Sequence, residues 1–188
     1  NTTLVESIMA ANTGLTATEA ATKVAVAMGL PVGMNVLTYD AYADQASMTN
    51  TEKEAALAVQ QANNKIMTVV NTFAAVADGS GMSATASFDL AMGSIADVVK
   101  AKVTTGAVLS FTTDMAAIVT AVEDDLETYA AANTSLNISV TDFKAIMVEA
   151  KKAVDNVVVK IDAFDITTSD ADKAAVVSTI RTVVEEVR

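Results

Sequence analysis

Hydrophobic residues recur at spacings of three and four along almost the whole chain, with polar residues between them. The apolar positions Val59, Ala62, Ile66, Val70 and Phe73, for example, fall on one face of a helix. No stretch alternates between apolar and polar residues in the manner of a half-buried strand. The pattern therefore predicts an all-α protein.

Helix start signals divide this pattern into elements. Two short helices are expected first, each opened by a threonine with a glutamate three residues later, a pairing that can form a capping box. These pairs are Thr3 with Glu6 and Thr16 with Glu19. The second helix is predicted to end near Met28, because Gly29 suits a left-handed C-terminal position and Pro31 cannot continue a helix. An irregular connection then covers about residues 30–48.

Five longer helices are expected after this connection, joined by short polar turns. Their predicted spans are 49–77, 83–104, 113–132, 139–161 and 169–187. Inward positions include Phe88 and Met92 on the second of these helices, and Phe143 and Ile146 on the fourth. Because short connections favour antiparallel neighbours, the pattern predicts an Ala/Val-rich up-and-down helical bundle, with the two short N-terminal helices packed across it.

The length of 188 residues suits a single helical domain spanning 1–188. A sub-boundary is expected near 30–48, between an N-terminal helical pair with its irregular connection (1–48) and the helical bundle (49–188). The N-terminus lacks the basic and apolar regions of a signal peptide. We therefore interpret the sequence as a fragment of a longer chain.

Composition narrows the range of functions. Twelve Lys and Arg against 23 Asp and Glu give a net charge of −11, so nucleic acid is not an expected partner, because its phosphates would be repelled. The chain has no His and no Cys, which removes imidazole acid–base catalysis, disulfides and the usual zinc and haem ligands. It also lacks a run of about 18 uncharged apolar residues, so no transmembrane segment is predicted. These observations favour a protein that is not an enzyme.

An acid-rich segment before the last helix is the candidate metal site. Its carboxylates are Asp162, Asp165, Asp170 and Asp172. Calcium prefers carboxylate and carbonyl oxygens, so calcium is the one cofactor considered for this chain. The spacing does not match an EF-hand loop, and capping of the last helix by Ser169 and Asp172 is the alternative interpretation. A second acidic run, at 123–127, is expected to cover the solvent face of its helix.

The irregular connection carries the candidate ligand-binding residues. These are Tyr39, Asp40, Tyr42 and Asp44. Tyrosine and aspartate exposed on a long connection can stack on a sugar or hold a peptide partner. The alternative is that the tyrosines anchor the connection onto the bundle.

The order of motifs in the first part of the chain resembles a known helical module. Thr2-Thr3-Leu4-Val5 is followed by Gly29-Leu30-Pro31 and then by Leu37-Thr38-Tyr39-Asp40. This order is similar to that of a module in very large bacterial secreted and cell-surface proteins of the adhesin type, where it lies among cadherin-like repeats and RTX calcium repeats. The chain departs from that pattern at Ala41, where a proline is common, and it has no glycine-aspartate calcium repeat of its own.

The resemblance implies an extracellular location on the bacterial cell surface, with neighbouring domains of a larger surface protein as partners. The leading hypothesis is a non-enzymatic structural or interaction module of an adhesin or surface-layer-like protein. One alternative is a glycan- or peptide-binding domain that uses the connection around Tyr39 and Tyr42. Another is a membrane-active helical protein, because helices rich in Ala and Val can refold into bilayers.

Overall fold

The computed structural model describes residues 2–40 and 47–187 and confirms the all-α prediction: these residues form seven α-helices and no strand. The short helices are α1 (Thr2–Ala11) and α2 (Ala17–Ala27). The long helices are α3 (Asn50–Gly79), α4 (Ala84–Thr105), α5 (Met115–Ala132), α6 (Val140–Asp162) and α7 (Asp170–Val187). A 3-10 turn, η2 (Thr134–Leu136), links α5 to α6.

Most helices begin at the residues that the sequence signals. Thr16 and Thr49 each form a complete capping box, with Glu19 and Glu52 respectively, in which the hydroxyl accepts from the glutamate backbone N–H and the carboxylate accepts in return. The expected cap at Thr3 is wrong, because α1 already begins at Thr2 and Thr3 lies inside the helix.

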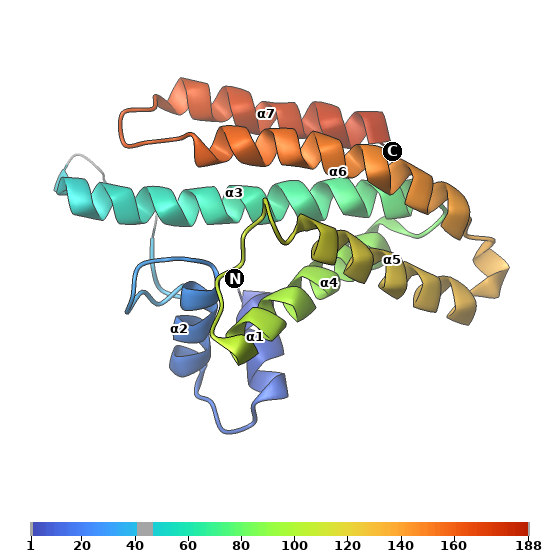
Figure 1. Cartoon of the computed structure of the whole chain (residues 1–188), viewed down its shortest axis with the longest axis horizontal. Coiled ribbons are helices and arrows are strands. Elements are labelled where there is room, and N and C mark those ends of the chain that lie inside the picture. The colour runs from blue at the N-terminus through green and yellow to red at the C-terminus, as the bar shows by residue number, and fades with distance from the viewer. Residues whose placement is uncertain (1, 41–46, 188) are drawn as a thin grey trace.

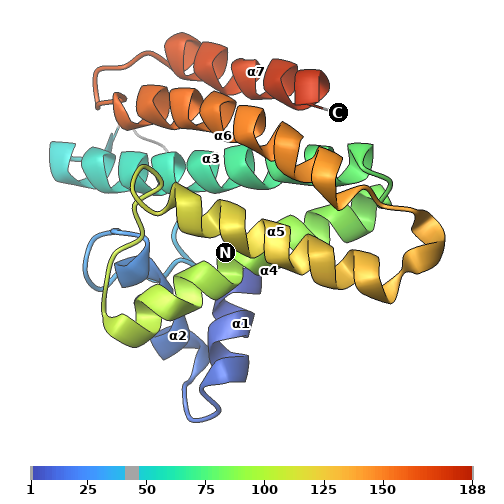
Figure 2. The ribbon, with the colours of Figure 1, turned by 45° about the vertical axis from the view of Figure 1, so that its right-hand side comes forward.

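The long helix α3 is the centre of the molecule. It packs against α4, α6 and α7, and at about 1.5 Å per residue its 30 residues extend over roughly 45 Å. Figures 1 and 2 show α3, α6 and α7 side by side as one layer, which α4 and α5 cross obliquely. The short helices α1 and α2 pack against each other and against α4, on the opposite side of the crossing.

One continuous core joins nearly all these elements. It includes Leu4 of α1, Val24 of α2, Phe73 of α3 and Phe143 of α6, each at most 2% exposed. The core also includes Leu30, Met34 and Val36, so it extends on both sides of the predicted sub-boundary. Burying a large apolar side chain contributes about 1.5–3 kcal/mol, and this shared burial couples the short N-terminal helices to the bundle.

Two of the expected inward positions are wrong. Ile146 is 39% exposed, and the neighbouring Met147 is fully buried in its place. Phe88 is also 39% exposed, while Ser87 and Ala91 face the core. In each helix the exchange is local to one position, and the expected inward residue Phe143 of α6 is fully buried. On α4 the small Ser and Ala side chains lie inward, because they permit close approach of neighbouring helices.

The connection between α4 and α5 ties the bundle to the short helices. The Leu109 amide donates a hydrogen bond of 2.6 Å to the Ala27 carbonyl at the end of α2. Asp114, which precedes α5, accepts from the Lys102 ammonium of α4 at 2.8 Å and from the Ser110 amide at 2.9 Å. This segment therefore fixes the ends of three helices relative to one another.

The last helix, α7, is held by a smaller cluster of its own. Val157 and Ile161 of α6 are buried there, with the partly buried Phe164, Val176 and Val177 packed against them. The side-chain amide of Gln61 also donates to the carbonyls of Ile161 and Phe164, at 2.9 and 3.1 Å. These bonds give partners to the Ile161 carbonyl in the last turn of α6 and to the Phe164 carbonyl just after the helix, where carbonyls lack a partner within the helix.

Candidate functional site

Local backbone hydrogen bonds shape the described part of the connection after α2. Gly29 adopts a left-handed conformation with φ of 69°, as its position after α2 predicts. Further along, the amides of Thr38 and Tyr39 donate to the Asn35 carbonyl, and the Asn35 side chain accepts from the Leu37 amide. The connection is therefore a series of tight turns.

Tyr39 is half-buried and packs against the main core, whereas Asp40 is exposed. Beside Tyr39 is an open hollow of about 500 Å³, whose lining includes Pro31, Asn35 and Thr38. The other two candidate ligand-binding residues, Tyr42 and Asp44, lie outside the described residues. Tyr39 thus both anchors the connection and borders a surface hollow.

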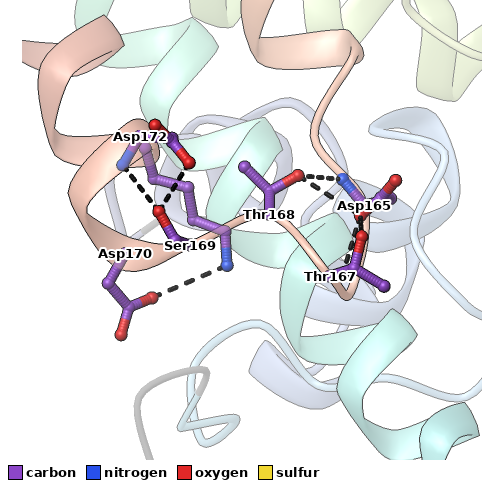
Figure 3. A network of polar contacts seen from close by, with 7 residues as sticks. Asp165, Thr167, Thr168, Ser169, Asp170 and Asp172 are labelled. Atoms are coloured by element: carbon purple, nitrogen blue, oxygen red, sulfur yellow. Dashed lines mark hydrogen bonds and ion pairs between the residues drawn. The ribbon is translucent and has the colours of Figure 1, made fainter.

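The acid-rich segment before α7 is organised as a turn and a helix cap. Figure 3 shows Asp165 and Asp172 in two separate groups of contacts. Asp165 accepts from the amide and the hydroxyl of Thr167, at 2.7 and 2.6 Å, and the Thr168 hydroxyl lies 3.3 Å from the same carboxylate oxygen. The hydrogen bonds from Thr167 lower the pKa of Asp165.

The other candidate calcium ligands have different partners. Asp172 accepts from the Ser169 hydroxyl at 2.6 Å, and its own amide donates to that hydroxyl, so this pair caps α7. Asp170 lies 3.7 Å from Lys173, and Asp162 forms an ion pair of 2.7 Å with Lys65 of α3. Within 2–40 and 47–187, no three acidic side chains come together in a group suited to a metal ion. The structure therefore supports the capping interpretation for Asp172 and does not bring the four carboxylates together.

The acidic run on α5 differs in part from the expectation of a fully solvated face. Glu127 forms an ion pair with Lys144 of α6, and Glu127 and the nearby acids Glu123 and Asp124 raise the pKa of Lys144. Asp125 instead turns toward α4, where it accepts from the buried Ser94 hydroxyl at 2.6 Å. Because Ser94 lies on a different helix, the spacing within α5 carried no signal for this contact.

Besides the hollow at Tyr39, the structure contains an apolar depression that the sequence did not predict. It has a volume of about 450 Å³ and lies between α3, α4 and α7, lined in part by Met67, Phe88 and Val177. Its only sequence signal is Phe88, which had been expected in the core. Among the helices in 2–40 and 47–187, none combines the length and apolarity needed to cross a membrane.

No protein-family model matches this chain, and neither a curated protein nor a solved structure matches it significantly.

Proposed function

We propose that this chain is a non-enzymatic structural and interaction module of a bacterial extracellular or cell-surface protein, of the adhesin or surface-layer-like kind. The observation that carries the proposal is the order of motifs in residues 2–40 of this chain, which resembles the order found in a helical module of such proteins. In this chain the same residues form α1, α2 and the turns up to Tyr39, and their apolar side chains join the core of the long helices.

The coupling of these parts suits a module that transmits force or holds its neighbours apart. The central helix α3 contacts three of the other long helices, so a load on one of them is shared by the core. The acidic side chains singled out in the sequence as metal ligands engage in caps, turns and ion pairs that stabilise helix ends.

Location is the decisive test of the proposal. Intact cells of the source bacterium are treated with a protease that cannot enter them, and the chain is followed with an antibody against its exposed surface. We expect the chain to be cleaved while a cytoplasmic marker stays intact. Protection of the chain until the cells are lysed would refute a surface or extracellular role.

A second candidate function is binding of a glycan or peptide by the connection around Tyr39. The hollow beside Tyr39, with polar groups from Asn35 and Thr38, favours it, because carbohydrate sites combine an aromatic face with hydrogen-bonding groups. Glycan and peptide arrays would be probed with the wild-type chain, with Tyr39→Ala and with Phe88→Ala as a matched control, since Phe88 is an exposed aromatic residue that does not line this hollow. Binding lost only in Tyr39→Ala is expected, and arrays without signal for the wild type would contradict this candidate.

A further inference from the structure

A groove of about 570 Å³ runs between the N-terminal half of α4 and the C-terminal half of α5. Leu90 of α4 and Tyr129 of α5, both half-buried, form apolar parts of its lining. Three aspartates also line it: Asp89 and Asp97 from α4 and Asp125 from α5. The groove therefore combines an apolar base with acidic edges.

Gly93 occupies the middle of this groove and has no structural reason to be glycine. It lies inside α4, its φ is not in the left-handed region, and a Cβ built on it meets no atom within 4 Å. Glycine in a helix interior weakens the helix, and its missing side chain allows the backbone of another helix to approach closely. The missing side chain leaves α4 open to such an approach at the centre of the groove.

The negative charge of the groove is not neutralised by basic residues in its lining. The described residues that line the groove include no lysine or arginine. Asp97 is 3.5 Å from Lys100, but both side chains are largely exposed, and such pairs contribute little. Asp125 accepts a hydrogen bond from Ser94, which is neutral, so its negative charge remains. A matching occupant therefore carries positive charges opposite these edges.

The shape of the groove selects a helix as the occupant. On α4 the lining extends from Ala86 to Asp97, about 17 Å or three helical turns at 1.5 Å per residue. Two neighbouring helices present a groove into which the side-chain ridge of a third helix fits, and a glycine at the crossing shortens the distance between helix axes.

We infer that the groove between α4 and α5 binds a basic amphipathic helix of a partner protein. The helix lays apolar and small side chains over Gly93, Leu90 and Tyr129, and its lysines or arginines lie against Asp89, Asp97 and Asp125. This inference rests on the interaction role proposed above and names the chemistry of the partner. Because it is tested by binding in solution, its failure leaves the result of the protease experiment on cells unaffected.

The test uses the full chain and a synthetic probe helix of about four turns, with leucines on one face and lysines on the other. A peptide with glutamates in place of the lysines is the control probe. Affinity is measured by calorimetry at about 150 mM salt, where long-range attraction between exposed charges is largely screened. We expect saturable binding of one lysine peptide per chain and no binding of the glutamate peptide.

Three variants separate a built groove from general attraction to an acidic protein. Gly93→Leu places a side chain in the groove at a position where a Cβ meets no atom within 4 Å, and we expect it to weaken binding at least about tenfold while the thermal midpoint does not fall. Asp89→Asn with Asp97→Asn is expected to have a similar effect. The matched control, Asp124→Asn with Glu149→Gln, removes as much charge elsewhere and is expected to change affinity by less than about twofold.

Amide shifts in NMR spectra on adding the lysine peptide supply an independent readout, and they are expected to centre on Gly93. The inference would be overturned by equal losses in the two charge variants, by unchanged affinity in Gly93→Leu, or by the absence of saturable binding to the wild type.

Discussion

Gly93 inside α4 and Gly106 directly after it provide a test of backbone conformation. An added side chain would have free space at both positions, but only Gly106 has a left-handed backbone. Gly93 lies in the helix interior, and Gly106 caps its C-terminus with φ of 66° and ψ of 21°. A Cβ added at either position meets no atom within 4 Å. Replacement of each by alanine therefore introduces neither a clash nor a new contact.

The two substitutions are expected to change stability in opposite directions. Gly93→Ala is expected to stabilise the protein by about 0.5–1 kcal/mol, because alanine restricts the unfolded chain and favours the helix. At Gly106 the left-handed conformation costs an L-residue about 1–2 kcal/mol. Part of this cost is offset by the restricted unfolded chain, so Gly106→Ala is expected to destabilise by about 0.5–1 kcal/mol.

Urea unfolding followed by far-ultraviolet circular dichroism measures both changes. In a thermal melt each 1 kcal/mol corresponds to a shift of about 2–4 °C for a chain of this length. A destabilised Gly93→Ala would mean that a methyl group meets a neighbour there, and would refute the open groove as well as the helix argument. A stabilised Gly106→Ala would refute the assigned C-cap.

Three further results are expected, each from a different part of the structure. Met147→Ala should destabilise by about 2–5 kcal/mol because it opens a cavity in the core, whereas Ile146→Ala should cost under about 1 kcal/mol; equal costs in urea unfolding would show that the buried face of α6 is misassigned. Thr49→Ala should cost about 1 kcal/mol through loss of the α3 cap, with Thr51→Ala, two residues further on in the first turn of α3, as the near-neutral control in the same assay. Burial by itself raises the pKa of Asp114, but hydrogen bonds from Lys102 and from the Ser110 amide, with the charge of Lys102, outweigh it and leave that pKa below the ordinary 3.8. The stability that Asp114 supplies is therefore complete above pH 3.8 and is lost as the pH falls through its lower folded value; an acid titration of Asp114→Asn should lack this loss, and an unchanged profile would contradict it.

The sequence was sufficient for features that depend on neighbours along the chain. Capping boxes require residues three positions apart, and the box at Thr16 forms as predicted. The helix expected from about residue 49 opens with a box of the same kind, formed by Thr49 and Glu52. Helix ends at Gly29 and Gly106 follow from the conformational freedom of glycine. The all-α fold and its long helices follow from the same local signals together with the period of the apolar residues.

Features that depend on which helices meet were not accessible in the same way. The period of α4 permits either Phe88 or Ser87 to face inward, and close packing against neighbouring helices selects the smaller residue. The hydrogen bond from Gln61 to the Ile161 carbonyl joins residues 100 positions apart in the sequence, so no local sequence pattern predicts it. For the candidate sites, composition identified the acids but carried no information on which of them would converge.

Two pairs of acidic residues differ in their surroundings. Asp165 and Asp172 lie beside backbone amides and hydroxyls of their own turn or helix start, so local structure accounts for them. Asp89 and Asp97 lie inside α4, where no helix start accounts for their charge, and they line an open groove together with an interior glycine. A helix that served only as structure would be more stable with alanine in place of Gly93. The combination is explained if α4 is also a surface to which another helix binds.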